Sequence, residues 1–310
     1  MTSLSSIPTS PPCTWSERVP TAARIRLVVV VVLLIAVYWG SIRHHLIARW
    51  LNDGNWSHGW LIPLFSLYFL YTRRSDLLRC QPKPGYTGAW VLAGSLCVYF
   101  VSGWVFRMAY PQTLSLVGSV FGLTLLLGGW SVIRVAWFPI AFLVLAIPLP
   151  ERIYVELTMP LRQWASTAAA ALMPLFASGL HTEAQAVVID YVMPGRPPGT
   201  LNIEEACSGM RLMMAFVTLG VAMAYLHDRP IWQRLVMVAS CLPIAVLCNT
   251  IRVTTTGLLY IQGYDDLAQG TPHQLLGVAM LMIALGLFAL LGYVLSHVFI
   301  EDTPGVEAPR

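Results

Sequence analysis

The sequence predicts an all-α polytopic membrane protein with about eight transmembrane helices and one short extracytoplasmic β-hairpin. Hydrophobic residues make up 56% of the 310-residue chain and charged residues only 11%, whereas a soluble domain carries about 25% charged residues. The mean hydropathy is +0.66. Stretches without charged residues recur along the chain, and many approach the ~20 residues that cross a bilayer as a helix.

The charge-free stretches set the order of the predicted elements. A Ser-, Thr- and Pro-rich segment, 1–23, is predicted to be a disordered cytoplasmic tail. A single integral membrane domain over 24–300 follows, and 301–310 form a second cytoplasmic tail. The predicted spans lie at about 25–42, 57–72, 88–106, 112–129, 133–149, 208–226, 231–250 and 273–298.

Arginine and lysine residues predict the orientation, because they collect on the cytoplasmic side of a membrane. One basic group precedes the first span, a second separates the second and third spans, and a third lies at 227–234. If all three are cytoplasmic, residue 150 lies outside and the segment 151–180 does not cross the membrane. Arg43 and Arg49 would then lie outside, against the rule. The three basic groups are Arg18, Arg24 and Arg26, then Arg73, Arg74, Arg79 and Lys83, then Arg229 and Arg234.

The segment 184–206 departs from the helical pattern. Residues 186–192 are mostly β-branched or aromatic, 194–199 are rich in Pro and Gly, and 200–204 return to an extended pattern. This order predicts a β-hairpin just outside the membrane. The hairpin leads directly into the stretch 202–211, which combines two carboxylates, a thiol, a hydroxyl and an arginine ahead of an apolar run.

The predicted orientation brings chemically capable groups to the outer face from three spans. Cys207 opens one span, Arg252 closes the next and His273 opens the last. The order Thr271-Pro272-His273-Gln274 resembles a capping box with Pro at the first helical position, which would place His273 in the first turn. The positive end of a helix favours a neutral imidazole and a thiolate.

These groups suggest acyl transfer by a cysteine enzyme. Cys207 would be the nucleophile, His273 the general acid and base, and Arg252 the stabiliser of the oxyanion. Each group also has a plain structural interpretation: Cys207 as a small apolar filler or in a disulfide with Cys248, Arg252 as a snorkelling helix end, and His273 as a cap. Candidates for substrate binding or support are Asn249, Arg211, Glu205 and Ser208.

Other function classes receive less support. The six cysteines form no CxxC pair and no Cys/His metal spacing, so we expect neither a metal site nor a cofactor. No basic face with interleaved aromatic residues points to nucleic acid. A transporter would place ionisable residues near the bilayer midplane, whereas here the charges lie at the span ends. A non-catalytic membrane component for polysaccharide export and a lipid acyltransferase remain alternatives.

Four segments carry a resemblance to the exosortase/archaeosortase family over most of residues 25–300. Residues 53–63, Asp-Gly-Asn-Trp-Ser-His-Gly-Trp-Leu-Ile-Pro, are similar to that family's Tyr-Ser-His-Gly region, with Trp56 where tyrosine is usual. The other three are Glu205-Ala206-Cys207-Ser208-Gly209-Met210-Arg211, Asn249-Thr250-Ile251-Arg252, and His273.

The resemblance implies a cysteine transpeptidase or protease of the bacterial inner membrane, with its active site facing the periplasm. Its partners would be exported proteins with a C-terminal sorting signal of the PEP-CTERM kind, which has a Pro-Glu-Pro-like motif, a transmembrane helix and a basic tail. Such systems are often linked to exopolysaccharide production. The family's catalytic cysteine, arginine and histidine correspond to Cys207, Arg252 and His273. The acceptor nucleophile, the balance of hydrolysis and transfer, the oligomeric state and the roles of Ser57 and His58 stay open.

Overall fold

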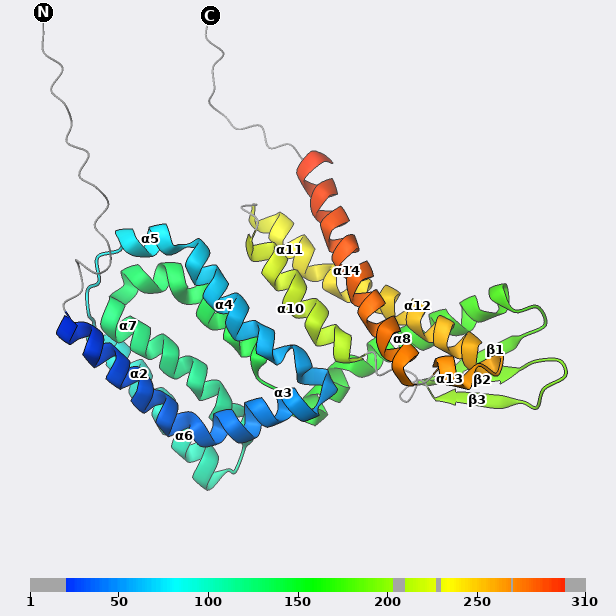
Figure 1. Cartoon of the computed structure of the whole chain (residues 1–310), viewed down its shortest axis with the longest axis horizontal. Helices are drawn as coiled ribbons and strands as arrows, with labels where there is room; N and C mark the ends of the chain where they lie inside the picture. Colours follow the sequence, from blue (N-terminus) through cyan, green and yellow to red (C-terminus); the bar gives the residue numbers. More distant parts are fainter. Residues whose placement is uncertain (1–20, 203–209, 227–229, 269, 299–310) are drawn as a thin grey trace, which may run out of the picture. The chain divides into compact units, whose positions relative to one another are not determined.

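The computed structural model describes residues 21–202, 210–226, 230–268 and 270–298. The chain divides into two compact units. The first unit contains Met1–Ala48 and Leu70–Ala141, and the second contains Arg49–Phe69 and Phe142–Arg310. Both units are mainly helical, and the second also carries a small β-sheet (Figure 1). The predicted hairpin and the predicted site all fall in the second unit.

Long apolar helices build the first unit. The α7 helix is interrupted at Gly129, which has φ 70°, a conformation that suits glycine. The chain folds back there, because Phe121 before Gly129 packs in one cluster with Ile133 and Ile140 after it. The elements are α2 (Thr21–Ser41), η1 (Ile42–Ile47), α5 (Arg74–Arg79), α6 (Tyr86–Phe100), η3 (Val101–Val105) and α7 (Ala109–Phe142).

Small residues allow the helices of the first unit to pack closely. A side chain at Gly88 of α6 would collide with the backbone of Leu126 in α7, and one at Gly122 would meet Leu92. Such close approach through small residues is typical of helices in membranes. The Tyr38 hydroxyl of α2 also shares hydrogen bonds with Ser115 and Ser119 of α7, at 3.0 and 2.9 Å.

The second unit contains helices of several kinds around the sheet. A short 3-10 helix, η2 (Gly54–Trp60), precedes α4 (Leu61–Thr72), whose last residues belong to the first unit. The other elements are α3 (Ala48–Asn52), η4 (Leu143–Ala146), α8 (Glu151–Phe176), β1 (His181–Gln185), β2 (Val188–Val192), β3 (Gly199–Asn202), α10 (Met210–Leu226), α11 (Ile231–Ala239), α12 (Cys241–Ile261), α13 (Asp265–Ala268) and α14 (Gly270–Val298).

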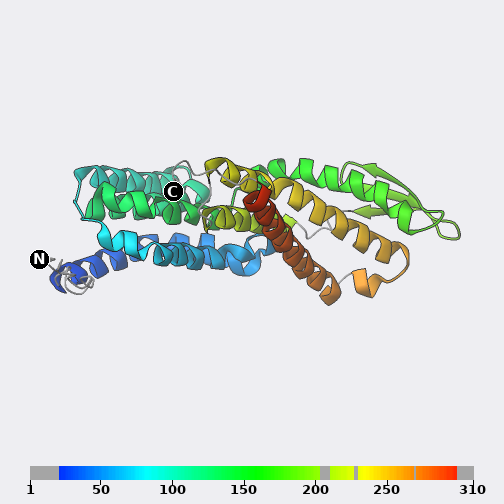
Figure 2. The same cartoon turned by 90° about the horizontal axis from the view of Figure 1, so that it is seen from above.

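The predicted hairpin is confirmed and is part of a three-stranded antiparallel sheet. Strands β2 and β3 pair with Ile189 opposite Leu201, and β1 adds a third strand on the other edge of β2. The sequence did not predict β1, because its residues His-Thr-Glu-Ala-Gln are mostly polar. Figures 1 and 2 both place the sheet beside α8 and the end of α12. One hydrophobic cluster joins these elements through Met173, Ile189, Leu201, Val253 and Ile261.

The prediction of about eight spans is confirmed only in part. Within the described residues, five helices are long and apolar enough to cross a membrane. The predicted span at 112–129 and most of the one at 133–149 fall in one of them, Ala109–Ala146, which folds back at Gly129. Two other predicted spans correspond to shorter helices, α4 and α10. The five are Arg24–Asn52, Tyr86–Val105, Ala109–Ala146, Ile231–Ile261 and Leu275–Val298.

The α8 helix is not among these five, which agrees with the prediction that 151–180 do not cross. One face of α8 is buried, through Ala165, Ala169 and Met173, and the opposite face exposes Trp164 and Leu175. The buried face packs on the second half of α12. The main role of α8 in the fold is therefore to support α12.

Candidate active site

Three predicted site residues, Glu205, Cys207 and Ser208, lie outside the described residues. The α10 helix begins at Met210, shortly after Cys207, and the backbone of Arg211 lies in its first turn. The backbone of His273 lies in the first turn of α14, as predicted, although the helix already begins at Gly270. Of Arg211 and His273 the structure describes the helix and not the side chain. Asn249 and Arg252 are described in full.

Arg252 does not close its helix, contrary to the prediction. The α12 helix continues past it for about two and a half turns to Ile261. The charge-free run ends at Arg252, but Val253 and Ile261 are buried against α8 and the sheet, and this packing keeps the chain helical. Arg252 therefore lies inside the helix and only 3% of it is exposed. A buried guanidinium is costly within a membrane protein, so its placement points to function.

The Arg252 guanidinium faces the α14 helix one turn beyond His273. A Cβ atom built on Gly277 would lie 3.9 Å from both terminal nitrogens of Arg252. Residues four apart on a helix share a face, so position 273 lies on the same side of α14 as Gly277. The guanidinium therefore lies beside the α14 backbone at Gly277.

Contacts among α10, α12 and α14 define how these helices are aligned. Towards one end, a Cβ atom on Gly220 of α10 would contact the Cys241 thiol and, at 3.3 Å, the Phe288 ring. Further along, the Cys248 thiol donates to the Met280 carbonyl oxygen at 3.8 Å. Because residue numbers rise along α12 while those of their partners fall along α14, the two helices run antiparallel. Cys248 is a free cysteine, so the alternative of a disulfide with Cys207 is not realised.

The alignment places three positions at one level of this three-helix bundle. Met210 lies ten residues before Gly220 on α10. Arg252 lies eleven residues after Cys241 on α12, and Gly277 lies eleven residues before Phe288 on α14. At 1.5 Å per residue, all three displacements are about 15–17 Å. The start of α10, the Arg252 guanidinium and the first turns of α14 therefore meet at the same level.

Asn249 lies about one helical turn before Arg252 on α12 and is partly buried. Its amide oxygen Oδ1 is buried, and within the described part of the chain it has no hydrogen-bond partner. Buried polar atoms in folded proteins are nearly always hydrogen-bonded. The oxygen is therefore an available acceptor close to the level of Arg252.

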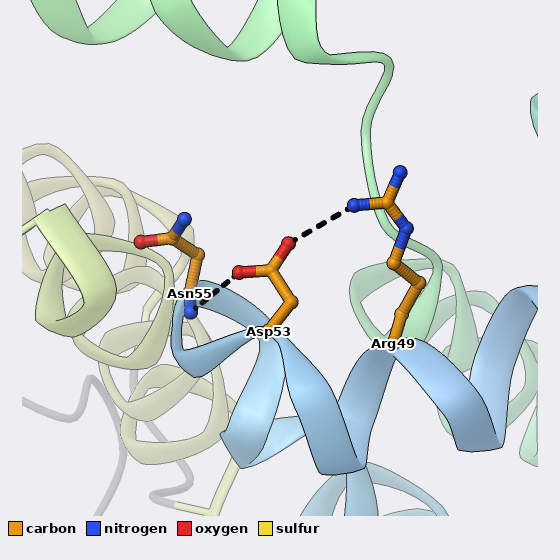
Figure 3. A network of polar contacts seen from close by, with 3 residues as sticks. All are labelled: Arg49, Asp53 and Asn55. Carbon is orange, nitrogen blue, oxygen red and sulfur yellow. Dashed lines mark hydrogen bonds and ion pairs between the residues drawn. The ribbon is translucent and has the colours of Figure 1, made fainter.

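A second element, η2, packs against α10 and is held firmly in place. Asp53 accepts a hydrogen bond from the Asn55 backbone N–H at 3.0 Å and pairs with Arg49 at 3.2 Å (Figure 3). The Trp50 indole N–H donates to the Ala146 carbonyl oxygen at 2.9 Å. Any side chain at Gly59 would collide with that indole. The sequence identified this segment by resemblance alone and gave it no chemical role.

The described groups at this level are two helix N-termini and a guanidinium, which are groups that can stabilise an anionic intermediate. The starts of α10 and α14 offer the positive ends of two helix dipoles, and Arg252 adds a full charge at nearly the same level. Among the described residues, no group of three His, Cys, Asp or Glu side chains could hold a metal ion. The described groups fit oxyanion stabilisation in acyl transfer.

Comparison with known families identifies the chain. The family described as transmembrane exosortase (Exosortase_EpsH) matches residues 50–290, which is most of the chain. No match was found among curated proteins or among solved structures. The matched range contains η2, the sheet, α10 and α12, and most of α14. This multi-pass membrane protein therefore belongs to the transmembrane exosortase family.

Proposed function

We propose that this exosortase is a membrane-embedded cysteine transpeptidase that cleaves C-terminal sorting signals of exported proteins. The active site would face the periplasm at the outer side of the inner membrane. The observation that carries the proposal is the buried Arg252 guanidinium, which lies at the level where α10 and α14 begin. Cys207 lies three residues before Met210, where the first of these helices begins, and the backbone of His273 is in the first turn of the second.

In the proposed reaction the neutral His273 ring accepts the proton of the Cys207 thiol, and the resulting thiolate attacks the carbonyl carbon of the scissile peptide bond. Negative charge develops on the carbonyl oxygen, and the Arg252 guanidinium stabilises it. His273 donates a proton to the leaving amine as the C–N bond breaks, which leaves a thioester on Cys207. An amine or hydroxyl acceptor, or water, then attacks the thioester while His273 accepts its proton. The thiolate is regenerated in this last step.

The remaining predicted residues have supporting roles in the proposal. The buried Asn249 oxygen would accept a hydrogen bond from a substrate amide N–H. Glu205, Ser208 and Arg211 flank Cys207 in the sequence. They would bind the sorting signal or balance charge around the thiolate.

The proposal can be tested by expressing the protein with a reporter that ends in a Pro-Glu-Pro motif, a transmembrane helix and a basic tail. We expect Cys207→Ala and His273→Ala to leave the reporter uncleaved while the enzyme still accumulates in the membrane. Arg252→Gln should lower the rate about 100–1,000-fold, the usual effect of losing an oxyanion donor. Arg252→Lys should recover only part of the rate, because lysine lacks the planar fork of donors.

Arg152→Ala is a matched arginine control, since Arg152 is exposed and pairs only with Glu156 within the described part of the chain. It should process the reporter at the normal rate. Normal processing by Cys207→Ala would refute the mechanism and favour a non-catalytic role in polysaccharide export. Mass spectrometry of the trapped thioester should show the reporter peptide on Cys207, and a fatty acyl group there would indicate a lipid acyltransferase.

A further inference from the structure

His58 has an environment that the proposed reaction does not explain. Both of its ring nitrogens are buried, and neither has a hydrogen-bond partner in the part of the chain that the structure describes. A buried polar group without a partner destabilises the free protein. Burial also lowers the pKa of His58 to about 4, so the ring is neutral at physiological pH. A neutral imidazole offers one N–H donor and one nitrogen acceptor.

The residues that flank His58 are packed against neighbouring elements. Trp56 is 3% exposed, and its ring lies 6.1 Å from that of Tyr154 in α8. Gly59 is pressed against the Trp50 indole, and that indole is itself hydrogen-bonded to Ala146. The residues on both sides of His58 are therefore fixed. His58 thus lies in a packed segment, although neither of its ring nitrogens has a hydrogen-bond partner among the described residues.

The position of His58 along α10 follows from contacts within the second unit. The Phe69 ring of α4 lies 5.1 Å from the ring of Tyr225, close to the end of α10. Trp60 lies nine residues before Phe69, which is about 13 Å along a helix. Phe216 lies the same number of residues before Tyr225 on α10. Since η2 ends at Trp60 and also packs against α10, it lies beside the first half of α10. This is the half that follows Cys207.

We infer that His58 is a substrate-binding residue that hydrogen-bonds the peptide backbone of the sorting signal near the scissile bond. The inference rests on the proposed function. An extended peptide presents one carbonyl acceptor and one N–H donor, which match the donor and the acceptor of a neutral imidazole. A carboxylate offers acceptors only and would leave one ring nitrogen unpaired. The backbone of the substrate is therefore the ligand that satisfies both nitrogens.

Binding to a catalytically inactive enzyme tests this inference. The probe is the uncleaved reporter with its Pro-Glu-Pro motif and transmembrane helix, titrated against detergent-solubilised Cys207→Ala enzyme. We expect His58→Leu in this background to weaken binding about tenfold or more, because both hydrogen bonds are lost. His58→Gln should stay close to the parent, since an amide also carries a donor and an acceptor. Ser57→Ala, which changes an exposed neighbour on η2, should bind like the parent.

Thermal unfolding of the same variants separates substrate binding from a structural role. Leucine removes two unsatisfied polar atoms, so His58→Leu should unfold at the same temperature as its parent or higher. Unchanged reporter binding by His58→Leu would overturn the inference, and so would weak binding that is accompanied by a lower unfolding temperature and is not restored in His58→Gln. If Cys207→Ala still cleaves the reporter, the proposed function fails, whatever the His58 variants do.

Discussion

At the scale of single residues, contacts between distant segments decide where polar and aromatic side chains lie. Arg252 is a strong candidate from sequence because a lone arginine follows an apolar run. In the structure it is buried and faces Gly277, a residue of another helix that no local pattern connects to it. On η2, the missing side chain of Gly59 lets the Trp50 indole fit against the backbone. Long-range contacts of this kind cannot be read from local periodicity.

The buried His58 ring makes stability depend on pH. Its pKa is about 4 in the folded protein and 6.5 in an unfolded chain, because burial disfavours the charged form. Between these values the unfolded chain binds a proton that the folded protein does not. The free energy of unfolding therefore carries no penalty from His58 above about pH 6.5, and it falls as the pH drops from 6.5 towards 4.

We expect the unfolding temperature of the detergent-solubilised protein to decrease between pH 6.5 and pH 4.5, and His58→Leu to reduce that decrease. His181→Leu is the control, since His181 is exposed at the start of β1. It should keep the pH slope of the parent. Equal slopes for the parent and His58→Leu would show that His58 does not titrate between the folded and unfolded states.

At the scale of elements, α12 shows how packing extends a helix. The sequence indicated a span that ends near residue 250, because arginine and three threonines follow the apolar run. The helix continues because α8 and the sheet bury Val253 and Ile261. Tertiary packing therefore outweighs the weak helix propensity of the threonines. As a result Arg252 lies within the helix, with its guanidinium directed at α14.

The loop between β2 and β3 stabilises the end of this extension. The Arg196 guanidinium donates to the Ile261 and Gln262 carbonyl oxygens, the latter at 2.9 Å. A cation at a helix C-terminus contributes about 0.3–1 kcal/mol. Arg196→Ala should therefore lower the free energy of unfolding by about 1 kcal/mol and speed amide hydrogen exchange at the end of α12.

The control for this prediction is again Arg152→Ala, which breaks an ion pair between two exposed side chains. Exposed pairs contribute little, so its effect on stability should stay below about 0.5 kcal/mol. Hydrogen exchange at the end of α12 that is unchanged in Arg196→Ala would mean that packing against α8 and the sheet holds the extension without Arg196.

At the scale of the whole molecule, the number and direction of the membrane crossings follow from two different signals. Length and hydropathy support five spans among the described helices. The direction rests on the positive-inside rule, which the arginines at 43 and 49 oppose. One of these, Arg49, pairs with Asp53, and this pairing partly neutralises its charge.

Thiol labelling tests the predicted direction. In cells whose outer membrane is opened and whose inner membrane is intact, a membrane-impermeant thiol reagent reaches only the periplasmic face of the inner membrane. It should label Cys207 and a Ser57→Cys variant, and spare Cys13 and Cys80. Each residue should be studied as the single cysteine of its variant, with permeabilised cells as the control that Cys80 can react. The partial exposure of Cys80 makes this control informative. Labelling of Cys80 while the inner membrane is intact, with Ser57→Cys spared, would reverse the orientation.

The sequence by itself determined the membrane class, the family, the β-hairpin and the chemically capable residues. These properties depend on composition, local periodicity and short motifs, which are visible along a single chain. Only the tertiary structure decided the third strand, the full length of α12, the contact of Arg252 with Gly277 and the burial of His58. Each of these depends on the free energy of packing between residues far apart in sequence. Such contacts leave no local pattern, because either partner alone is compatible with many neighbours.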